Sequence, residues 1–182
     1  MDKKYEMLKD DTIEVGIRIL HRIKALKDFN DVRKGDLGGY IEKEENLSHE
    51  GNCWIYDNAN VFDDAWVFGD AQVYGDACVS NNAQVFGDAC VSNNAQVFGN
   101  ACVSNNAHIT NINDYIVIGP INSRSDFTTF YLTKDKEIMV SCGCFNDTID
   151  EFIKAVNETH RDNDKYKNDY NTVSECVKML LK

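Results

Sequence analysis

The chain has 182 residues and carries 19 Lys and Arg against 30 Asp and Glu, a formal net charge of −11. Its length suits one long domain or two short ones, and its acidic excess disfavours direct binding to nucleic acid, whose phosphates it would repel. No apolar run approaches the length of a membrane span and no secretory leader follows Met1, so we expect a cytoplasmic protein whose seven cysteines stay reduced.

Residues 1–46 are predicted to form an N-terminal β cap. Three stretches within them are rich in β-forming residues: 5–7, 12–15 and 17–26. In the last stretch, alternation places four side chains on one side: Ile17, Ile19, His21 and Ile23. We expect these residues to cover the apolar interior of the repeating coil that follows them, because the open end of such a coil would otherwise be exposed to water.

Residues 47–112 consist of eleven consecutive hexads. Every sixth residue from Ala59 to Ala107 is Ala, and Val or Ile follows two residues later. A period of six predicts a parallel β-helix in which each hexad supplies one strand and one corner. We expect Val to point inward, Ala to fit the crowded corner, and the Gly, Asn or Asp before Ala to adopt turn backbone. Three hexads then close one triangular coil of eighteen residues, since a coil of twelve leaves too little interior for Val and Ala.

A coil of eighteen residues stacks the outward aromatic side chains in columns on its three faces. Exposed aromatic ladders of this size are typical of a contact surface for self-association or for a partner. The predicted partner surface contains six aromatic and four acidic residues: Trp54, Tyr56, Trp66, Phe68, Tyr74, Phe86, Asp64, Asp70, Asp76 and Asp88. Two plainer explanations stay open, because aromatic rings also favour strands and Asp also favours turns. Cys78, Cys90 and Cys102 fall on different faces of such a coil and therefore cannot bridge one another.

The hexads hold most of the acidic excess. Residues 47–112 contain no Lys or Arg but carry seven acids: Glu50, Asp57, Asp63, Asp64, Asp70, Asp76 and Asp88. Such a surface attracts basic partners. We therefore expect a protein partner, with a basic nucleic-acid-handling enzyme as one candidate, and a homo-oligomer that is a dimer or a trimer.

Residues 113–182 are predicted to form a small α+β module of three strands and two helices. The three strands are expected at residues 115–118, 127–133 and 137–141. The run Thr148-Ile-Asp-Glu matches a capping box, so the first helix is predicted to begin at Thr148 and to end near His160. The second helix is expected from about Lys165.

The C-terminal module supplies the candidate ligand-binding or partner-binding residues: Ser123, Arg124, Thr128, Thr129, Cys142, Cys144 and His160. Ser123 and Arg124 lie on a loop after a strand, where a guanidinium can hold an anionic group. Two thiols and a His allow a thiol nucleophile or part of a metal site, while packed structural thiols are the plainer explanation. We predict no catalytic residue, no metal ion and no cofactor.

Three motifs together are distinctive: the hexads, the segment Lys34-Gly-Asp-Leu-Gly-Gly-Tyr40, and a C-terminal run that includes Gly119-Pro-Ile-Asn-Ser and Cys142-Gly-Cys-Phe. With these motifs the chain resembles, over nearly its whole length, a group of hexapeptide-repeat proteins common in phages and prophages and often labelled transferases. The resemblance implies a left-handed β-helix, an exception to the usual right-handed crossover. In the wider superfamily, trimeric acyltransferases bind acyl-CoA between neighbouring coils and use a His as general base. In this chain His49 and His108 lie at the two ends of the hexads, which offer no Lys or Arg to a CoA phosphate.

The expected fold class is mainly β: a left-handed parallel β-helix of hexapeptide repeats with an N-terminal β cap and a small C-terminal α+β module. The expected function is that of a non-catalytic, acidic, phage-encoded interaction protein that binds and inhibits a host macromolecule by mimicking nucleic-acid charge. One alternative is a trimeric acyltransferase that uses acyl-CoA. The other is a binder of a small anionic ligand or nucleotide through the C-terminal module.

Overall fold

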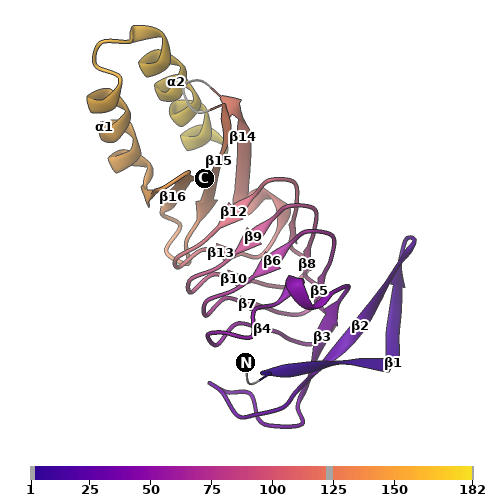
Figure 1. Ribbon diagram of the computed structural model, residues 1–182. Helices are drawn as coiled ribbons and strands as arrows, with labels where there is room; N and C mark the ends of the chain where they lie inside the picture. Colours follow the sequence, from indigo (N-terminus) through magenta and orange to yellow (C-terminus); the bar gives the residue numbers. More distant parts are fainter. Residues whose placement is uncertain (1–2, 122–124, 182) are drawn as a thin grey trace.

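The computed structural model describes residues 3–121 and 125–181. Figure 1 shows three parts in a row: N-terminal strands with a projecting hairpin, a central coil, and a C-terminal sheet with two helices. The fold is mainly β, as predicted. No helix in the described ranges has the length and the apolar run needed to cross a membrane.

The N-terminal strands extend one sheet of the coil. Strands β1 (Tyr5–Val15) and β2 (Arg18–Ala25) form an antiparallel hairpin. Strand β3 (Leu37–Ile41) pairs with β2 in antiparallel and with β5 in parallel. The parallel coil therefore begins with β3, before the first predicted hexad at residue 47.

The row of side chains predicted to lie on one side of the second strand is not buried at its outer end. Ile17 is 97% exposed and Ile19 is 56% exposed, whereas Leu20 and Ile23 are fully buried. The hairpin lies beside the edge of the coil, where Arg18 contacts Glu42 and Asp63, and the coil interior does not cover these two isoleucines.

The coil consists of two-residue strands separated by corners, in nearly four turns. Their bounds are β4 (Trp54–Ile55), β5 (Asn60–Val61), β6 (Trp66–Val67), β7 (Gln72–Val73), β8 (Cys78–Val79), β9 (Gln84–Val85), β10 (Cys90–Val91), β11 (Gln96–Val97), β12 (Cys102–Val103) and β13 (His108–Ile109). Each strand from β4 to β10 pairs in parallel with the strand eighteen residues further on, as Asn60 does with Cys78. This register confirms the eighteen-residue coil. It produces three faces: face 1 (β3, β5, β8, β11), face 2 (β4, β7, β10, β13) and face 3 (β6, β9, β12).

The hexad residues occupy their predicted places. The repeat valines are fully buried, and the alanines from Ala59 to Ala107 are at most 1% exposed. The residue two positions before each Ala has a positive φ, either a Gly or an Asn or Asp, the non-glycine types that tolerate this conformation best. Corner side chains also bond between coils: a carboxylate oxygen of Asp57 accepts from the backbone N of Gly75 at 3.0 Å. Turn chemistry and stacking of the corners thus account for part of the acidic content.

The C-terminal module closes the far end of the coil. Strands β14 (Tyr115–Ile121), β15 (Asp126–Leu132), β16 (Ile138–Cys142) and β17 (Phe145–Thr148) form an antiparallel sheet in that order. The prediction of three strands missed β17, which follows β16 through a tight turn in which Gly143 has a φ of 62°. Helices α1 (Ile149–Thr159) and α2 (Asp164–Leu180) follow. The hydroxyl of Thr148 accepts from the backbone N of Glu151, which confirms the predicted start of α1.

The two faces of this sheet serve two cores. Tyr131 and Met139 pack with the coil interior, whereas Phe130 and Val140 pack with α1 and α2. This is the two-residue alternation of a sheet covered on both sides. The hydroxyl of Thr129 fixes the sheet to the coil, since it accepts from the backbone N of Cys102 at 2.9 Å.

Short 3-10 helices, η1 (Glu44–Asn46) and η2 (Ile112–Asp114), lie at the two ends of the coil. In η2 one carboxylate oxygen of Asp114 accepts from the backbone N and the hydroxyl of Thr110 at 2.8 and 2.7 Å and from the backbone N of Asn111 at 3.1 Å. Burial opposes ionisation of this carboxyl. These hydrogen bonds and nearby Lys136 outweigh burial and hold the pKa of Asp114 below its ordinary value.

Candidate functional site

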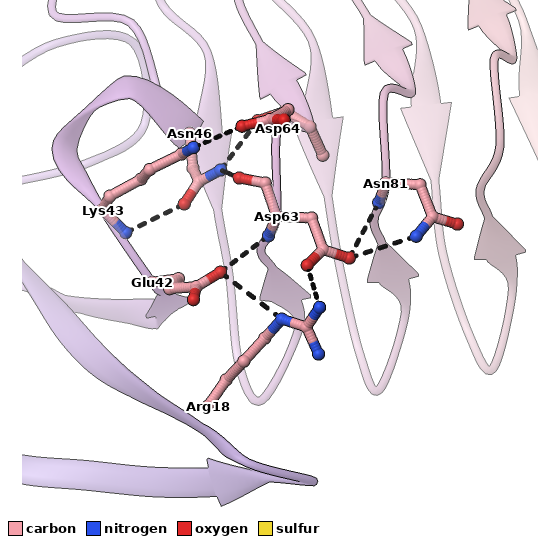
Figure 2. Close-up of polar contacts among 8 residues, drawn as sticks. Arg18, Glu42, Lys43, Asn46, Asp63, Asp64 and Asn81 are labelled. Atoms are coloured by element: carbon pink, nitrogen blue, oxygen red, sulfur yellow. Dashed lines mark hydrogen bonds and ion pairs between the residues drawn. The ribbon is translucent and has the colours of Figure 1, made fainter.

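A polar network joins the hairpin to the edge of the coil where face 1 meets face 3. Figure 2 shows Arg18 reaching from the hairpin to the carboxylates of Glu42 and Asp63. Glu42 accepts from the backbone N of Asp63 at 2.8 Å, and Asp63 in turn accepts from the backbone N of Asn81 at 3.2 Å. The guanidinium of Arg18 also lies 5.3 Å from the ring centroid of Phe62. These contacts hold the hairpin at a fixed place beside the coil.

A second ion pair lies next to this network. Lys43 Nζ is 2.5 Å from a carboxylate oxygen of Asp64, and this hydrogen bond holds the pKa of Asp64 below and that of Lys43 above their ordinary values. Buried Asn46 holds the backbone around this pair, because its amide donates to the carbonyl oxygens of Asp63 and Ala65 at 3.0 and 2.8 Å. Its side-chain oxygen accepts from the backbone N of Lys43 at 2.9 Å (Figure 2). The polar part of this edge is therefore built on a rigid base.

Exposed apolar side chains flank the network on both sides. Ile17 and Ile19 lie on the hairpin side, and Trp66, 42% exposed, lies on face 3. Trp66 stacks on Phe68 with ring centroids 3.9 Å apart, and Phe68 stacks on Phe86 at 4.7 Å. One shallow hollow is lined by the two isoleucines together with Lys43 and Asp64, and a second, lined by Trp66, shares Lys43 and Asp64 with it.

We call this continuous region the corner surface. It comprises Ile17, Arg18, Ile19, Glu42, Lys43, Asp63, Asp64, Trp66, Phe68 and Phe86. Its apolar groups lie on both sides of a charged centre that holds three acids and two bases. An arrangement of this kind offers both desolvation and directional charge contacts to a partner.

The predicted partner surface is corrected at one residue. Trp54 is only 1% exposed, because the N-terminal cap folds over the first coil and places the rings of Tyr5 and Phe29 with centroids 6.2 and 5.3 Å from it. Tyr56 and Tyr74 stack at 4.4 Å on face 2, where the hydroxyl of Tyr56 donates to Asp31 at 2.7 Å. The aromatic residues therefore form two separate ladders, on face 2 and on face 3.

The four predicted acidic residues are all exposed, but they differ in their contacts. Asp64 pairs with Lys43 as described. Asp70 accepts from the backbone N of Asn52 at 2.9 Å, and Asp76 accepts weakly from the amide of Asn58 at 3.4 Å. Asp88 lies with Asp70 in a polar hollow on the outside of the coil. Corner turns and stacking use Asp70 and Asp76, whereas Asp64 belongs to the corner surface.

The C-terminal residues predicted from sequence are partly brought together. Cys142, Cys144 and His160 line one pocket of about 260 Å³ between the sheet and the helices, which we call the thiol pocket. Its remaining lining is mostly apolar and includes Tyr170, on whose ring His160 stacks at 5.7 Å. Thr128 lies behind it, with its hydroxyl 3.2 Å from the sulfur of Cys142.

The other predicted residues of that group lie elsewhere. Thr129 faces the coil and is used in fixing the sheet there. Ser123 and Arg124 lie outside the described residues. Within the described ranges, no three His, Cys, Asp or Glu side chains are grouped closely enough to hold a metal ion.

Sequence reasoning missed Arg18 and Lys43 as parts of a surface. It based the partner surface on the hexads of residues 47–112 alone, and both of these residues reach the coil from the cap. Gly16 did carry a signal, because a Gly between two β-rich stretches is typical of a hairpin turn, which places Arg18 near the tip of that hairpin.

Comparison with known proteins supports the solenoid. A family model described as a YdcK β-solenoid repeat matches residues 71–87. The chain is also 54% identical over 48 residues to a protein of Escherichia coli (strain K12) named "Uncharacterized acetyltransferase YdcK". That match covers 26% of this chain and 15% of the relative, so the chain spans a small part of the relative's length. The similarity is one of repeat structure, with the coil of this chain resembling part of a hexapeptide-repeat, transferase-like protein.

Proposed function

We propose that this protein is a β-solenoid interaction protein whose corner surface binds a protein partner with a basic and partly apolar face. The observation that carries the proposal is the stack of exposed Trp66 on half-buried Phe68 and Phe86, which is continuous through Asp64 and Lys43 with the exposed isoleucines of the hairpin. Trp residues in such positions are the commonest binding hot spots, because a large ring buries much area at little cost in conformational entropy.

The charge distribution supports a basic partner. Residues 47–112 carry seven acids and no Lys or Arg, and both bases of the corner surface are already paired with acids. The field of the coil is therefore negative and steers a positively charged protein toward it, with an effect that salt weakens. A basic nucleic-acid-handling enzyme is the partner class that fits this charge, and inhibition of that enzyme by occupation of its nucleic-acid site is the outcome that we propose.

The test is a titration of the protein against a panel of basic nucleic-acid-handling enzymes at rising salt. We expect a complex that weakens as salt increases and that loses at least tenfold in affinity in Trp66→Ala, as a hot spot of about 1.4 kcal/mol or more requires. Met179→Ala is the matched control, since Met179 is 65% exposed but lies on α2 at the other end of the molecule (Figure 1). Absence of a salt-sensitive complex, or equal losses in the two variants, would contradict the proposal.

Acyl transfer is the second candidate function, favoured by the similarity to the Escherichia coli protein named an acetyltransferase. In this function three copies of the chain would pack side by side and bind acyl-CoA between their coils. His108 on β13 lies on the outside of face 2 and is half-buried, whereas His49 accepts from the backbone N of Lys4 and faces Glu44. His108 is therefore the better placed general base.

Calorimetric titration with acetyl-CoA separates the two functions. The interaction function predicts no heat of binding at millimolar acetyl-CoA, and the solution mass measured in parallel gives the oligomeric state. Saturable binding of acetyl-CoA would favour the enzyme instead, if His108→Ala keeps that binding and loses acyl transfer.

A further inference from the structure

A lysine is buried at the N-terminal end of the coil, where the cap covers the first turn. Lys4 is only 1% exposed, and its Nζ donates to the carbonyl oxygen of Cys53 at 2.9 Å and of Gly51 at 3.3 Å. Burial of an ammonium group is costly unless a charged or strongly polar partner compensates it. Besides these carbonyls, Nζ contacts the sulfur of Cys53 at 3.2 Å.

The Cys53 thiol is sealed in the same place. It is fully buried, and its sulfur lies 3.5 Å from the carbonyl oxygen of Ser48. Burial is the larger effect on both groups: it raises the pKa of Cys53 and lowers the pKa of Lys4, while the attraction and hydrogen bond between the two groups act in the opposite direction on each. The pair therefore has two forms that differ by one proton transfer. The ammonium–thiolate form supplies the species that peroxides oxidise, and the amine–thiol form supplies a nucleophilic nitrogen.

We propose that Lys4 and Cys53 form a reversible covalent cross-link, Nζ–O–Sγ, when hydrogen peroxide enters this end of the coil. In the first step the thiolate attacks peroxide, the O–O bond breaks, an S–O bond forms and water leaves, which converts the thiol to a sulfenic acid. In the second step an N–O bond forms between Nζ and the sulfenic oxygen, while one N–H bond and the O–H bond break. A second peroxide accepts the two electrons and two protons and becomes two waters.

The geometry favours an inserted oxygen over a direct S–N bond. The 3.2 Å between Nζ and Sγ must shorten much further for a direct bond than for a linkage that contains one more atom. Tight packing at this end of the coil resists such movement, because Lys4 and Cys53 are both held by backbone carbonyls. Proximity favours the second step, since the amine is fixed beside the sulfenic acid as soon as it forms.

The cross-link has a structural consequence. Lys4 directly precedes β1, and Cys53 directly precedes β4 in the first turn of the coil. A covalent bond between them fastens the N-terminal cap to the coil and restricts the unfolded chain over the segment that it closes. We therefore expect oxidation by peroxide to raise the melting temperature and reduction by dithiothreitol to restore the original value.

Peptide mass spectrometry of the full chain after treatment with hydrogen peroxide tests the proposal. A Cys144→Ser, Cys176→Ser background removes the two exposed thiols, and peptide-level assignment is needed because methionines also gain oxygen. We expect the peptides of Lys4 and Cys53 to be joined, with a mass one oxygen higher and two hydrogens lower than their sum. Dithiothreitol should separate them, and Lys4→Arg should abolish the linked product.

Four outcomes would overturn the proposal. Three of them are recovery of Cys53 as a sulfinic or sulfonic acid with Lys4 unmodified, a disulfide from Cys53 to another cysteine, and an unmodified Cys53 under a dose of peroxide that oxidises half-buried Cys78. A linked product that has lost two hydrogens but gained no oxygen would contradict the inserted atom. Fragment ions from the chain that retains Lys4 and Cys53 decide the result, so the test does not depend on the folding of Lys4→Arg.

Discussion

Stacking of one corner directly on the next makes a sharp prediction at two glycines. Gly87 and Gly99 have nearly the same left-handed backbone, with φ of 66° and 72°. A Cβ added at Gly87 would lie 2.9 Å from the backbone N of Asn105, its stacking neighbour eighteen residues on, whereas a Cβ at Gly99 would meet nothing within 4 Å. The coil has ended above Gly99, because the residue eighteen positions further, Val117, belongs to β14. Ala substitutions at the two glycines therefore differ only in the clash.

The magnitudes follow from separable costs. Left-handed backbone costs an L residue roughly 1–2 kcal/mol, and this cost applies to both variants. Ala also restricts the unfolded chain, which offsets about 0.4–1 kcal/mol in both. Overpacking against backbone that cannot move adds about 1–3 kcal/mol, and this term applies only to Gly87. We expect Gly87→Ala to lower the free energy of unfolding by about 1–3 kcal/mol more than Gly99→Ala does.

Urea unfolding of the two variants beside the unsubstituted protein measures this difference, with the slope of each transition as a check on the extent of unfolding. A midpoint for Gly87→Ala clearly below that of Gly99→Ala is the expected result. Equal midpoints, or the reverse order, would refute the reasoning that corners eighteen residues apart rest on each other.

Three further predictions follow from burial and charge. Trp54→Ala should cost about 3–5 kcal/mol of unfolding free energy because the ring is buried, whereas Trp66→Ala should cost under about 1 kcal/mol; similar losses by urea unfolding would contradict the placement of these rings. Asp114→Asn should cost about 1–3 kcal/mol at neutral pH and flatten the acid limb of stability. Since the folded-state pKa of Asp114 lies below 3.8, its stabilisation is present above that pH and is lost as the pH falls through the folded pKa; an unchanged acid limb in thermal melts would contradict this. Arg18→Ala should speed amide hydrogen exchange at the tip of the β1–β2 hairpin. It should change the free energy of unfolding by under about 1 kcal/mol, because the ion pairs of Arg18 are partly exposed. Unchanged exchange at the tip would exclude Arg18 as the group that holds the hairpin.

The coil could be predicted from sequence because its period is local and strict. Val recurs every six residues, the period of a parallel β-helix, and the Gly, Asn and Asp residues mark each corner. The exposure of single residues could not be predicted in the same way. Trp54 occupies an outward strand position and is covered by the cap, so its burial depends on residues far away in sequence.

The candidate sites depend even more on such distant contacts. Cys142, Cys144 and His160 were singled out for their chemistry, but their shared pocket forms because α1 and α2 pack back on the sheet. Arg18 and Lys43 reach the corner surface from outside the hexads. Lys4 and Cys53 lie 49 positions apart, and no pattern in the sequence indicates that they meet.

The central claim is that a partner covers the corner surface, and fluorine NMR of protein labelled with fluorotryptophan tests it most directly. The chain has two tryptophans, of which Trp54 is buried under the cap and Trp66 is exposed on the corner surface. Adding a basic nucleic-acid-handling enzyme that binds should shift or broaden the Trp66 resonance and leave that of Trp54 unchanged. A complex in which the Trp66 resonance does not change would contradict the account.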